Sequence, residues 1–133
     1  MKKITLIAVV VIGFLTVGFT LQEQSKPWSV PEASAKVANP VKASAESVAA
    51  GKSLWIGECQ SCHGKTGIGD GKKAAQLNTP TPDLTKAAFQ SQSDGALYYK
   101  VAEGRGDMPG FKKKFPEKED IWNLVNFMRT LKK

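Results

Sequence analysis

The sequence predicts an all-α domain, because its apolar residues follow the spacing of helices and nowhere that of strands. Near residues 48–59 and 121–131, apolar residues recur every three or four positions, which places them on one face of a helix. No stretch alternates apolar and polar residues with the period of two that is typical of half-buried strands. The chain has 133 residues and no internal repeat, so we expect a single domain.

Three helices are expected, at about residues 45–59, 94–103 and 117–131. Each starts at a residue suited to that position, because a serine side chain can cap free amides and proline fits a first turn. Gly104 should end the second helix. The starting residues are Ser44, Ser93 and Pro116, and the apolar stripe of the last helix is Ile121, Leu124, Val125, Met128 and Leu131.

Two loops are expected between these helices. Glycines at positions 64, 67, 69 and 71, followed by Pro80 and Pro82, predict a loop of about twenty residues, since proline blocks regular helix. Residues 104–111, GRGDMPGF, are predicted to be a second irregular segment.

Residues 1–22 are predicted to be an export signal or a membrane anchor. Lys2 and Lys3 precede nineteen uncharged, mostly apolar residues at positions 4–22. That length just reaches the ~17 to 25 residues that span a bilayer. No small-residue cleavage site follows closely, since Ala33-Ser34-Ala35 is too far downstream, so an uncleaved anchor is slightly favoured. The protein is therefore expected to be exported, on the periplasmic side, either soluble or tethered to the membrane.

Residues 23–43 are predicted to be a tether, because they are rich in Pro, Ala and Ser and cannot bury a core. Trp28 is the exception, and we expect it either to be an isolated aromatic residue or to pin this arm onto the domain. The folded domain is expected at residues 44–133. Residues 51–133 carry 14 Lys and Arg against 9 Asp and Glu, a net charge of +5. This charge suits an acidic protein partner better than nucleic acid.

Both cysteines and the only histidine of the chain lie in the sequence CQSCH, residues 59–63. A closed zinc site needs four Cys or His ligands, and the chain has three. A redox dithiol would need a thioredoxin-like βαβ setting, and a simple disulfide gives no role to the adjacent histidine. Cys-x-x-Cys-His is, in contrast, the signature of covalent haem attachment. Cys59 and Cys62 can each bond one vinyl group of a single porphyrin, and His63 can bind its iron.

The sixth position of the iron cannot be filled by a second histidine, so the soft candidates are Met1, Met108 and Met128. Met1 lies in the export segment, and Met128 lies on the apolar stripe of the last helix, where a core residue is expected. Met108 lies in an irregular loop 45 residues beyond His63, beside Pro109 and between glycines that allow close approach to a flat ring. Met108 is therefore the predicted distal ligand.

Four motifs together resemble the class I c-type cytochromes, the small mono-haem electron carriers. They are GKSLWIGECQSCHG, PDL, GRGDMPGF and DIWNLVNFMRTL, which follow the order of that family between about Val48 and Leu131. The resemblance implies three to four helices around one covalently bound haem c. It also implies that the first and last helices pack together, with Gly51 and Trp55 facing Leu124 and Phe127. Pro82 matches the proline whose carbonyl accepts a hydrogen bond from the proximal histidine.

The expected function is a one-electron carrier with His63 and Met108 as axial ligands, rather than an enzyme. The alternative is a haem enzyme subunit or gas-binding sensor with an open sixth position. The partners implied are redox proteins with an acidic docking surface, such as a terminal oxidase or a quinol-cytochrome c reductase, and the domain is expected to be monomeric.

Lysines at 65, 72, 73 and 112–114 flank the ligand loops, and they either guide such a partner or form a generally solvated face. No residue clearly matches the propionate-binding groups of the family, and the candidates are Tyr98, Tyr99 and Arg105.

Overall fold

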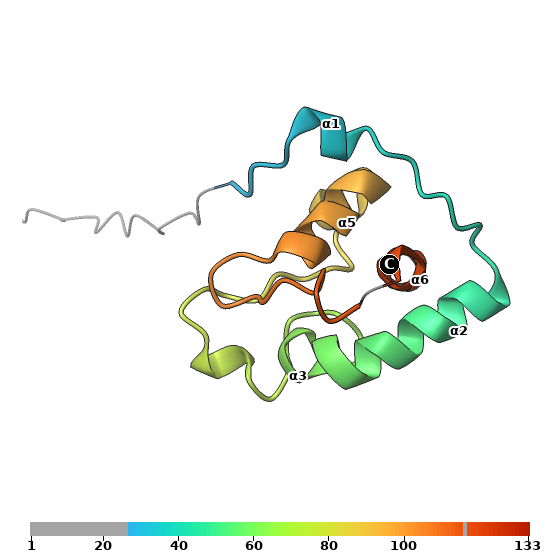
Figure 1. Ribbon diagram of the computed structural model, residues 1–133. Coiled ribbons are helices and arrows are strands. Elements are labelled where there is room, and N and C mark those ends of the chain that lie inside the picture. Colours follow the sequence, from blue (N-terminus) through green and yellow to red (C-terminus); the bar gives the residue numbers. More distant parts are fainter. Residues whose placement is uncertain (1–26, 116) are drawn as a thin grey trace, which may run out of the picture.

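The structure, a computed structural model, describes residues 27–115 and 117–133, in which helices are joined by loops and no strand forms (Figure 1). This confirms the all-α prediction. None of the described helices is long and apolar enough to cross a membrane. The export or anchor segment, residues 1–22, and Pro116 lie outside the described residues. The elements are α1 (Glu32–Ala35), α2 (Ala45–Leu54), the π-helical turn η1 (Trp55–Cys59), α3 (Gln60–His63), the 3-10 turn η2 (Ala74–Gln76), α4 (Ala87–Gln90), α5 (Asp94–Glu103) and α6 (Lys118–Arg129).

The first predicted helix is confirmed, and it runs through α2, η1 and α3 into the cysteine motif. The Ser44 hydroxyl accepts a hydrogen bond from the amide of Ser47 at 3.2 Å, which caps its start. The π-helical turn η1 lies between α2 and α3, and it includes Cys59, the first cysteine of the motif. Such turns are often found at functional sites. The helix ends at Gly64, whose φ of +79° lies in the region that favours glycine.

The other two predicted helices are also confirmed, α5 at residues 94–103 and α6 at 118–129. The Ser93 hydroxyl accepts from the amide of Ala96 at 3.2 Å, and Gly104 follows the last turn with a φ of +68°. The short elements α1, η2 and α4 were not predicted, because three or four residues carry no apolar period to detect.

The core forms where α2 crosses α6, as Figure 1 shows. Gly51 lies against the α6 backbone: a Cβ atom there would come within 2.1 Å of the Asn123 carbonyl oxygen. The Trp55 ring lies 5.6 Å from that of Phe127, so this predicted contact of the first and last helices is confirmed. The largest fully buried side chains are those of Trp55, Leu97, Ile121, Leu124 and Val125.

The arm predicted as a tether lies on the domain from residue 27 onward. In Figure 1 it crosses α5 at α1 and then descends to the start of α2. The Asn39 amide donates to the side-chain oxygen of Asn126 at 2.8 Å, and Asn126 donates back to the Val41 carbonyl at 3.1 Å. Asn126 is itself buried, so the arm and α6 satisfy each other's polar groups.

We predict that Gly51→Ala lowers the free energy of unfolding by about 2 kcal/mol, since overpacking a close helix crossing forces the backbone to shift. The added methyl would clash with the carbonyl of Asn123 and also approach the Phe127 Cβ within 2.9 Å. Denaturant unfolding of the holoprotein, followed by far-UV circular dichroism, measures the loss.

Gly57→Ala is the matched control, because a Cβ atom at Gly57 would meet nothing within 4 Å. It should unfold at the wild-type denaturant concentration or slightly above, since alanine favours helix over glycine. Equal destabilisation by both substitutions would contradict the close crossing at Gly51.

Candidate haem site

The end of α3 is capped by the glycine loop that follows it. The amide of Gly69 donates to the His63 carbonyl at 2.9 Å, and that of Gly71 donates to the Cys62 carbonyl at 3.1 Å. A Cβ atom at Gly71 would lie 2.4 Å from the Ser61 carbonyl oxygen, so only glycine allows this approach. The loop therefore satisfies the free carbonyls of the helix end and fixes the backbone that carries the motif.

The same loop holds the segment that contains Pro82. The Leu84 amide donates to the Gly67 carbonyl at 2.8 Å, and a Cβ atom at Gly69 would lie 2.5 Å from the Thr81 carbonyl oxygen. Pro82 is thereby held beside the backbone that caps His63. The side chain of Asp83 accepts hydrogen bonds from the amide and hydroxyl of Thr85, which lower the pKa of Asp83 and form a tight turn after Pro82.

The Met108 loop is a tight turn. Arg105 and Met108 exchange backbone hydrogen bonds, at 2.8 and 3.0 Å. A Cβ atom at Gly104 would lie 2.5 Å from the Met108 carbonyl oxygen, which explains the glycine there. The turn is tied to the Pro82 segment by Asp107, whose carboxylate accepts from Asn78 Nδ2 at 3.1 Å and from the Thr79 amide at 3.0 Å.

These two loops and the motif enclose a cavity of about 620 Å³. Its walls bring together all five residues selected from the sequence: Cys59, Cys62, His63, Pro82 and Met108. Met128, which was predicted to be a core residue, is buried as expected but also lines this cavity. Apolar side chains from α4, α5 and the loops complete the walls: Leu77, Leu84, Phe89, Leu97, Val101 and Phe111.

Burial controls the protonation of the motif side chains. It raises the pKa of the Cys59 thiol to about 12, with smaller contributions from the charges of Glu58 and Cys62, so this thiol is protonated at neutral pH. Burial also lowers the pKa of His63, so its imidazole is neutral there, which is the form that binds iron. Both cysteines are free of disulfide bonds.

The cavity fits a haem by its size, by its apolar walls and by the two thiols and the imidazole that line it. Its volume lies within the range of about 300–1,000 Å³ that is usual for cofactor pockets. Two buried side-chain atoms on its walls, His63 Nδ1 and Thr81 Oγ1, have no hydrogen-bond partner among the described residues. No bond joins His63 Nδ1 to the Pro82 carbonyl, so the role of Pro82 stays a prediction.

Sequence reasoning missed several residues of the cavity wall, above all Lys100, and it named Trp28 only as a residue that could pin the arm onto the domain. Arg105, one of three candidates for binding the haem propionates, also lines the cavity. Tyr98 and Tyr99 instead line a smaller hollow of about 370 Å³ between α5 and the arm, where the Tyr98 ring packs on Trp122 at 4.2 Å. No sequence signal marked Lys100, because its place in the wall depends on how α5 packs.

An all-α fold with the motif, the Pro82 segment and the Met108 loop around one apolar cavity defines a class I c-type cytochrome. The family described as cytochrome c oxidase, cbb3-type, subunit III matches residues 46–128, and the chain belongs to this family. The protein therefore binds a haem c covalently and takes part in haem-based electron transfer. Cys59 and Cys62 fit the Cys-x-x-Cys-His motif of this attachment.

Solved structures with a similar fold support this assignment. The c-type cytochrome KustC0563 is 28% identical, with a TM-score of 0.55, over 62% of this chain and 98% of its own. A chain of the Kuenenia stuttgartiensis reducing HAO-like protein complex is 24% identical, with a TM-score of 0.66, over 84% of this chain and 53% of its own. Cytochrome cL from Methylophaga aminisulfidivorans is 23% identical, with a TM-score of 0.50, over 64% of this chain and 55% of its own.

The present chain thus spans about half the length of the Kuenenia complex chain and of cytochrome cL. At their levels of identity these two matches establish the fold alone. A comparison with the curated proteins gives no significant match.

We predict that Asp107→Ala loosens the Met108 loop, because it removes both hydrogen bonds to the Pro82 segment. Hydrogen–deuterium exchange at the amides of Arg105 and Met108 should become about five- to tenfold faster, since local opening needs fewer bonds to break. Asn78→Ala removes one of the two bonds and should give a smaller acceleration. Unchanged exchange in both variants would show that Asp107 does not hold the loop.

Proposed function

We propose that this protein is a one-electron carrier in which His63 and Met108 are the two axial ligands of the haem iron. When bound, the haem supplies a ferrous–ferric couple. His63 and Met108 would supply the two ligands, and the chain adds an apolar cavity and two thiols for covalent attachment. Keeping the same ligands in both oxidation states would limit rearrangement on electron transfer, which suits a carrier. A thioether ligand favours the ferrous form and thus a higher reduction potential than two histidines would give.

The observation that carries this proposal is the location of Met108 in the wall of the same cavity as His63. The two residues come from different elements, and each is held by its own backbone hydrogen bonds: His63 by the glycine loop and Met108 by the turn with Arg105. Pro82 is the proposed acceptor for His63 Nδ1, because its carbonyl lies close to Gly69, which caps His63. Such a hydrogen bond would orient the imidazole and make it a stronger ligand to the iron.

Met128 is the competitor for the distal position, since it lines the cavity too, so the two methionines must be compared directly. We expect Met108→Leu to abolish the weak sulfur-to-ferric absorption band and to let the reduced protein bind about one equivalent of carbon monoxide. Met128→Leu conserves volume and should keep the band and stay inert to carbon monoxide. The opposite pattern would make Met128 the ligand.

The alternative function is a haem enzyme subunit or gas sensor with an open sixth position. The neighbour that belongs to a complex described as HAO-like establishes the fold alone, and it favours neither function. Rapid, stoichiometric carbon monoxide binding by the reduced wild-type protein would favour this alternative and reject the carrier. Inertness, together with the sulfur-to-ferric band, would favour the carrier.

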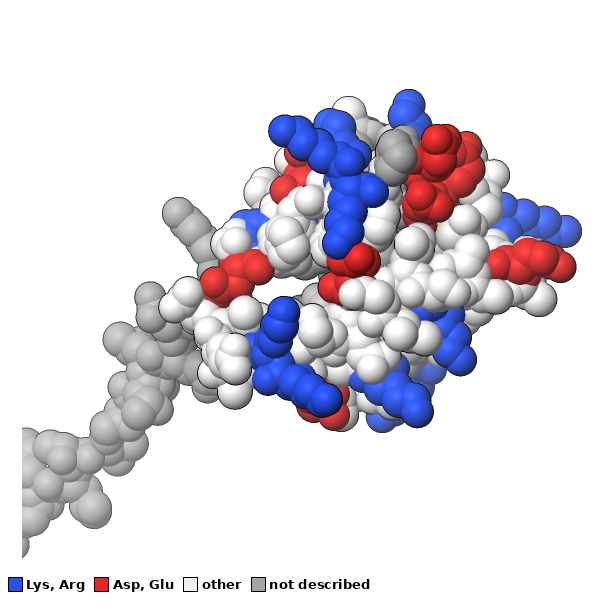
Figure 2. Space-filling view, turned by 60° about the horizontal axis from the view of Figure 1, so that its bottom comes forward, with Lys and Arg blue, Asp and Glu red and all other residues white. Residues whose placement is uncertain are grey.

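We propose that the lysines near the cavity guide an acidic redox partner. Figure 2 shows one face of the domain, on which Lys and Arg side chains lie on both sides of a hollow, with carboxylates between them. Two of the proposed lysines are paired within the domain, Lys112 with Glu103 at 3.2 Å and Lys114 with Glu58. Lys73 is held beside the motif by its backbone, because its amide donates to the Ser61 carbonyl at 2.8 Å.

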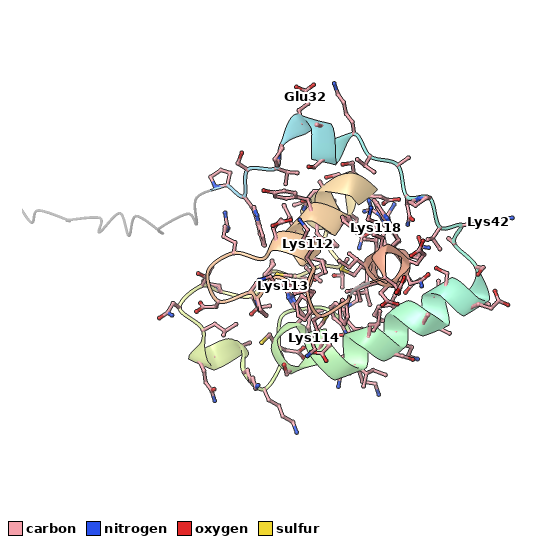
Figure 3. All side chains as sticks on the ribbon, in the orientation of Figure 1. Glu32, Lys42, Lys112, Lys113, Lys114 and Lys118 are labelled. Atoms are coloured by element: carbon pink, nitrogen blue, oxygen red, sulfur yellow. The ribbon has the colours of Figure 1, made fainter. Side chains whose placement is uncertain are left out.

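Lys73→Gln should therefore lower the second-order rate of electron transfer to an acidic partner by about twofold at low ionic strength, and it should flatten the salt dependence of that rate. Lys42→Gln is the control with the same charge change. Lys42 precedes α2 and lies at the right-hand edge of the domain in Figure 3, away from the lysine run 112–114 in the middle of the view. Stopped-flow rates at several salt concentrations decide the question, and equal effects of the two substitutions would reject local steering.

We further propose that the protein acts on the periplasmic side of a membrane, with residues 1–22 as signal or anchor. The family description names a cytochrome c oxidase subunit, which supports a terminal oxidase as a partner. The mass of the mature protein would separate signal from anchor.

A further inference from the structure

Residues 27–43, here called the strap, are fixed to the domain at two places away from the cavity. The Ser93 hydroxyl at the start of α5 donates to the Ala35 carbonyl at 2.6 Å. Nearer α2, the strap exchanges hydrogen bonds with the buried side chain of Asn126 through Asn39 and Val41, as described above. These bonds give the strap a specific path over α5.

Gly95 allows the strap to lie this close to α5. It is buried in the first turn of the helix, and a Cβ atom there would lie 2.2 Å from the Ser34 carbonyl oxygen and 2.6 Å from that of Val37. Both atoms belong to the backbone of the strap, so any side chain at this position must push the strap away. Glycine is otherwise unfavourable in a helix, by about 1 kcal/mol relative to alanine. Its presence here is explained by the strap.

The strap brings Trp28 to the haem cavity. The indole lines the cavity wall together with Pro27, and it contacts the two basic residues of that wall. Its ring centre lies 4.7 Å from the guanidinium carbon of Arg105 and 5.5 Å from the ammonium nitrogen of Lys100, both within cation–π range. Lys100 is half-buried in this corner, and this burial, with a smaller contribution from the charge of Arg105, lowers its pKa.

We propose that the strap is a built-in cover for one edge of the haem, and that Trp28 is a positioning residue that raises the reduction potential by excluding water from this edge. The ferric centre carries one more positive charge than the ferrous centre, so a drier surrounding favours the ferrous form. Trp28 also limits the hydration of Lys100 and Arg105. Their positive charges then act on the iron through a medium of lower dielectric constant, which raises the reduction potential further.

The match to the Kuenenia complex chain is consistent with the strap as part of the fold. It covers 84% of the present chain, more than residues 44–133 make up, so it must extend into the segment before α2. The match to KustC0563, which covers 62%, is smaller than the domain itself.

The test compares midpoint potentials of the holoprotein and its variants by spectroelectrochemistry. Trp28→Ala should shift the potential to a lower value, whereas Trp28→Phe keeps a ring over the two cations and should retain most of the wild-type potential. This proposal rests on the proposed carrier function, and the sulfur-to-ferric band tests the two separately. The band should stay intact in both Trp28 variants. A potential that fell together with loss of the band would reflect a displaced ligand and would overturn the proposed cover.

Gly95→Ala tests the strap without changing the cavity, because Gly95 does not contribute to the cavity wall. It should expose the strap to trypsin, so cleavage after Lys36, identified by mass, should accelerate at least severalfold. It should also lower the potential in the same direction as Trp28→Ala. Since alanine favours helix, weakening of α5 itself would not account for either change.

Two further results for the reduction potential would also overturn the proposal. One is a wild-type potential in Trp28→Ala with the band retained. The other is a Gly95→Ala variant whose strap is cleaved faster but whose potential is unchanged, which would make the strap a structural element only. Unchanged cleavage in Gly95→Ala would also count against it, because Gly95 would then not seat the strap.

Discussion

Trp55 lies where the crossing of α2 and α6 meets the haem cavity, and its indole makes contacts on both sides. It packs on Phe127 of α6, and its ring centre lies 5.7 Å from that of His63. Its ring nitrogen also donates to the Gly64 carbonyl at 3.2 Å, at the residue that ends α3. The buried crossing and the orientation of the histidine are thus coupled through one rigid side chain, 1% exposed. A change in the packing of α6 would therefore be transmitted to the site.

The two sides of the cavity are built in different ways. On the His63 side, a helix end is capped by three consecutive carbonyl contacts, from the amides of Gly69, Gly71 and Lys73. On the Met108 side, a turn rich in glycine is held by its own short hydrogen bonds and by the carboxylate of Asp107. On the Met108 side, the two hydrogen bonds to the Asp107 carboxylate are exposed to solvent. Loss of the methionine would accordingly be the easier of the two ways to open the proposed coordination, because less stable segments open first.

Local patterns predicted those parts of the fold that depend on neighbouring residues. The bounds of α5 follow from Ser93 and Gly104. The cysteine motif indicates its cofactor directly, because two thiols that can attach a porphyrin and an imidazole that can bind its iron lie within five residues. The cavity wall was predicted only in part. Lys100, Trp28 and Met128 enter it through packing between segments that are distant in sequence, and no local pattern records such packing. Tyr98 and Tyr99 were named as candidates on the same helix as Lys100, but the rotation of α5 turns them to the other hollow.

The sequence by itself determined the class of fold and the kind of cofactor, because helix periodicity and ligand chemistry are properties of residue type and spacing. It also predicted Met108 as the distal ligand. Only the tertiary structure decided the course of residues 27–43. Their composition of Pro, Ser and Ala offers no core-forming pattern, and it predicts a tether. These residues are held by the close approach of their backbone to Gly95 of α5 and by hydrogen bonds with the buried side chain of Asn126 on α6. A segment with few apolar side chains can still be ordered where its backbone carbonyls find donors on a rigid partner.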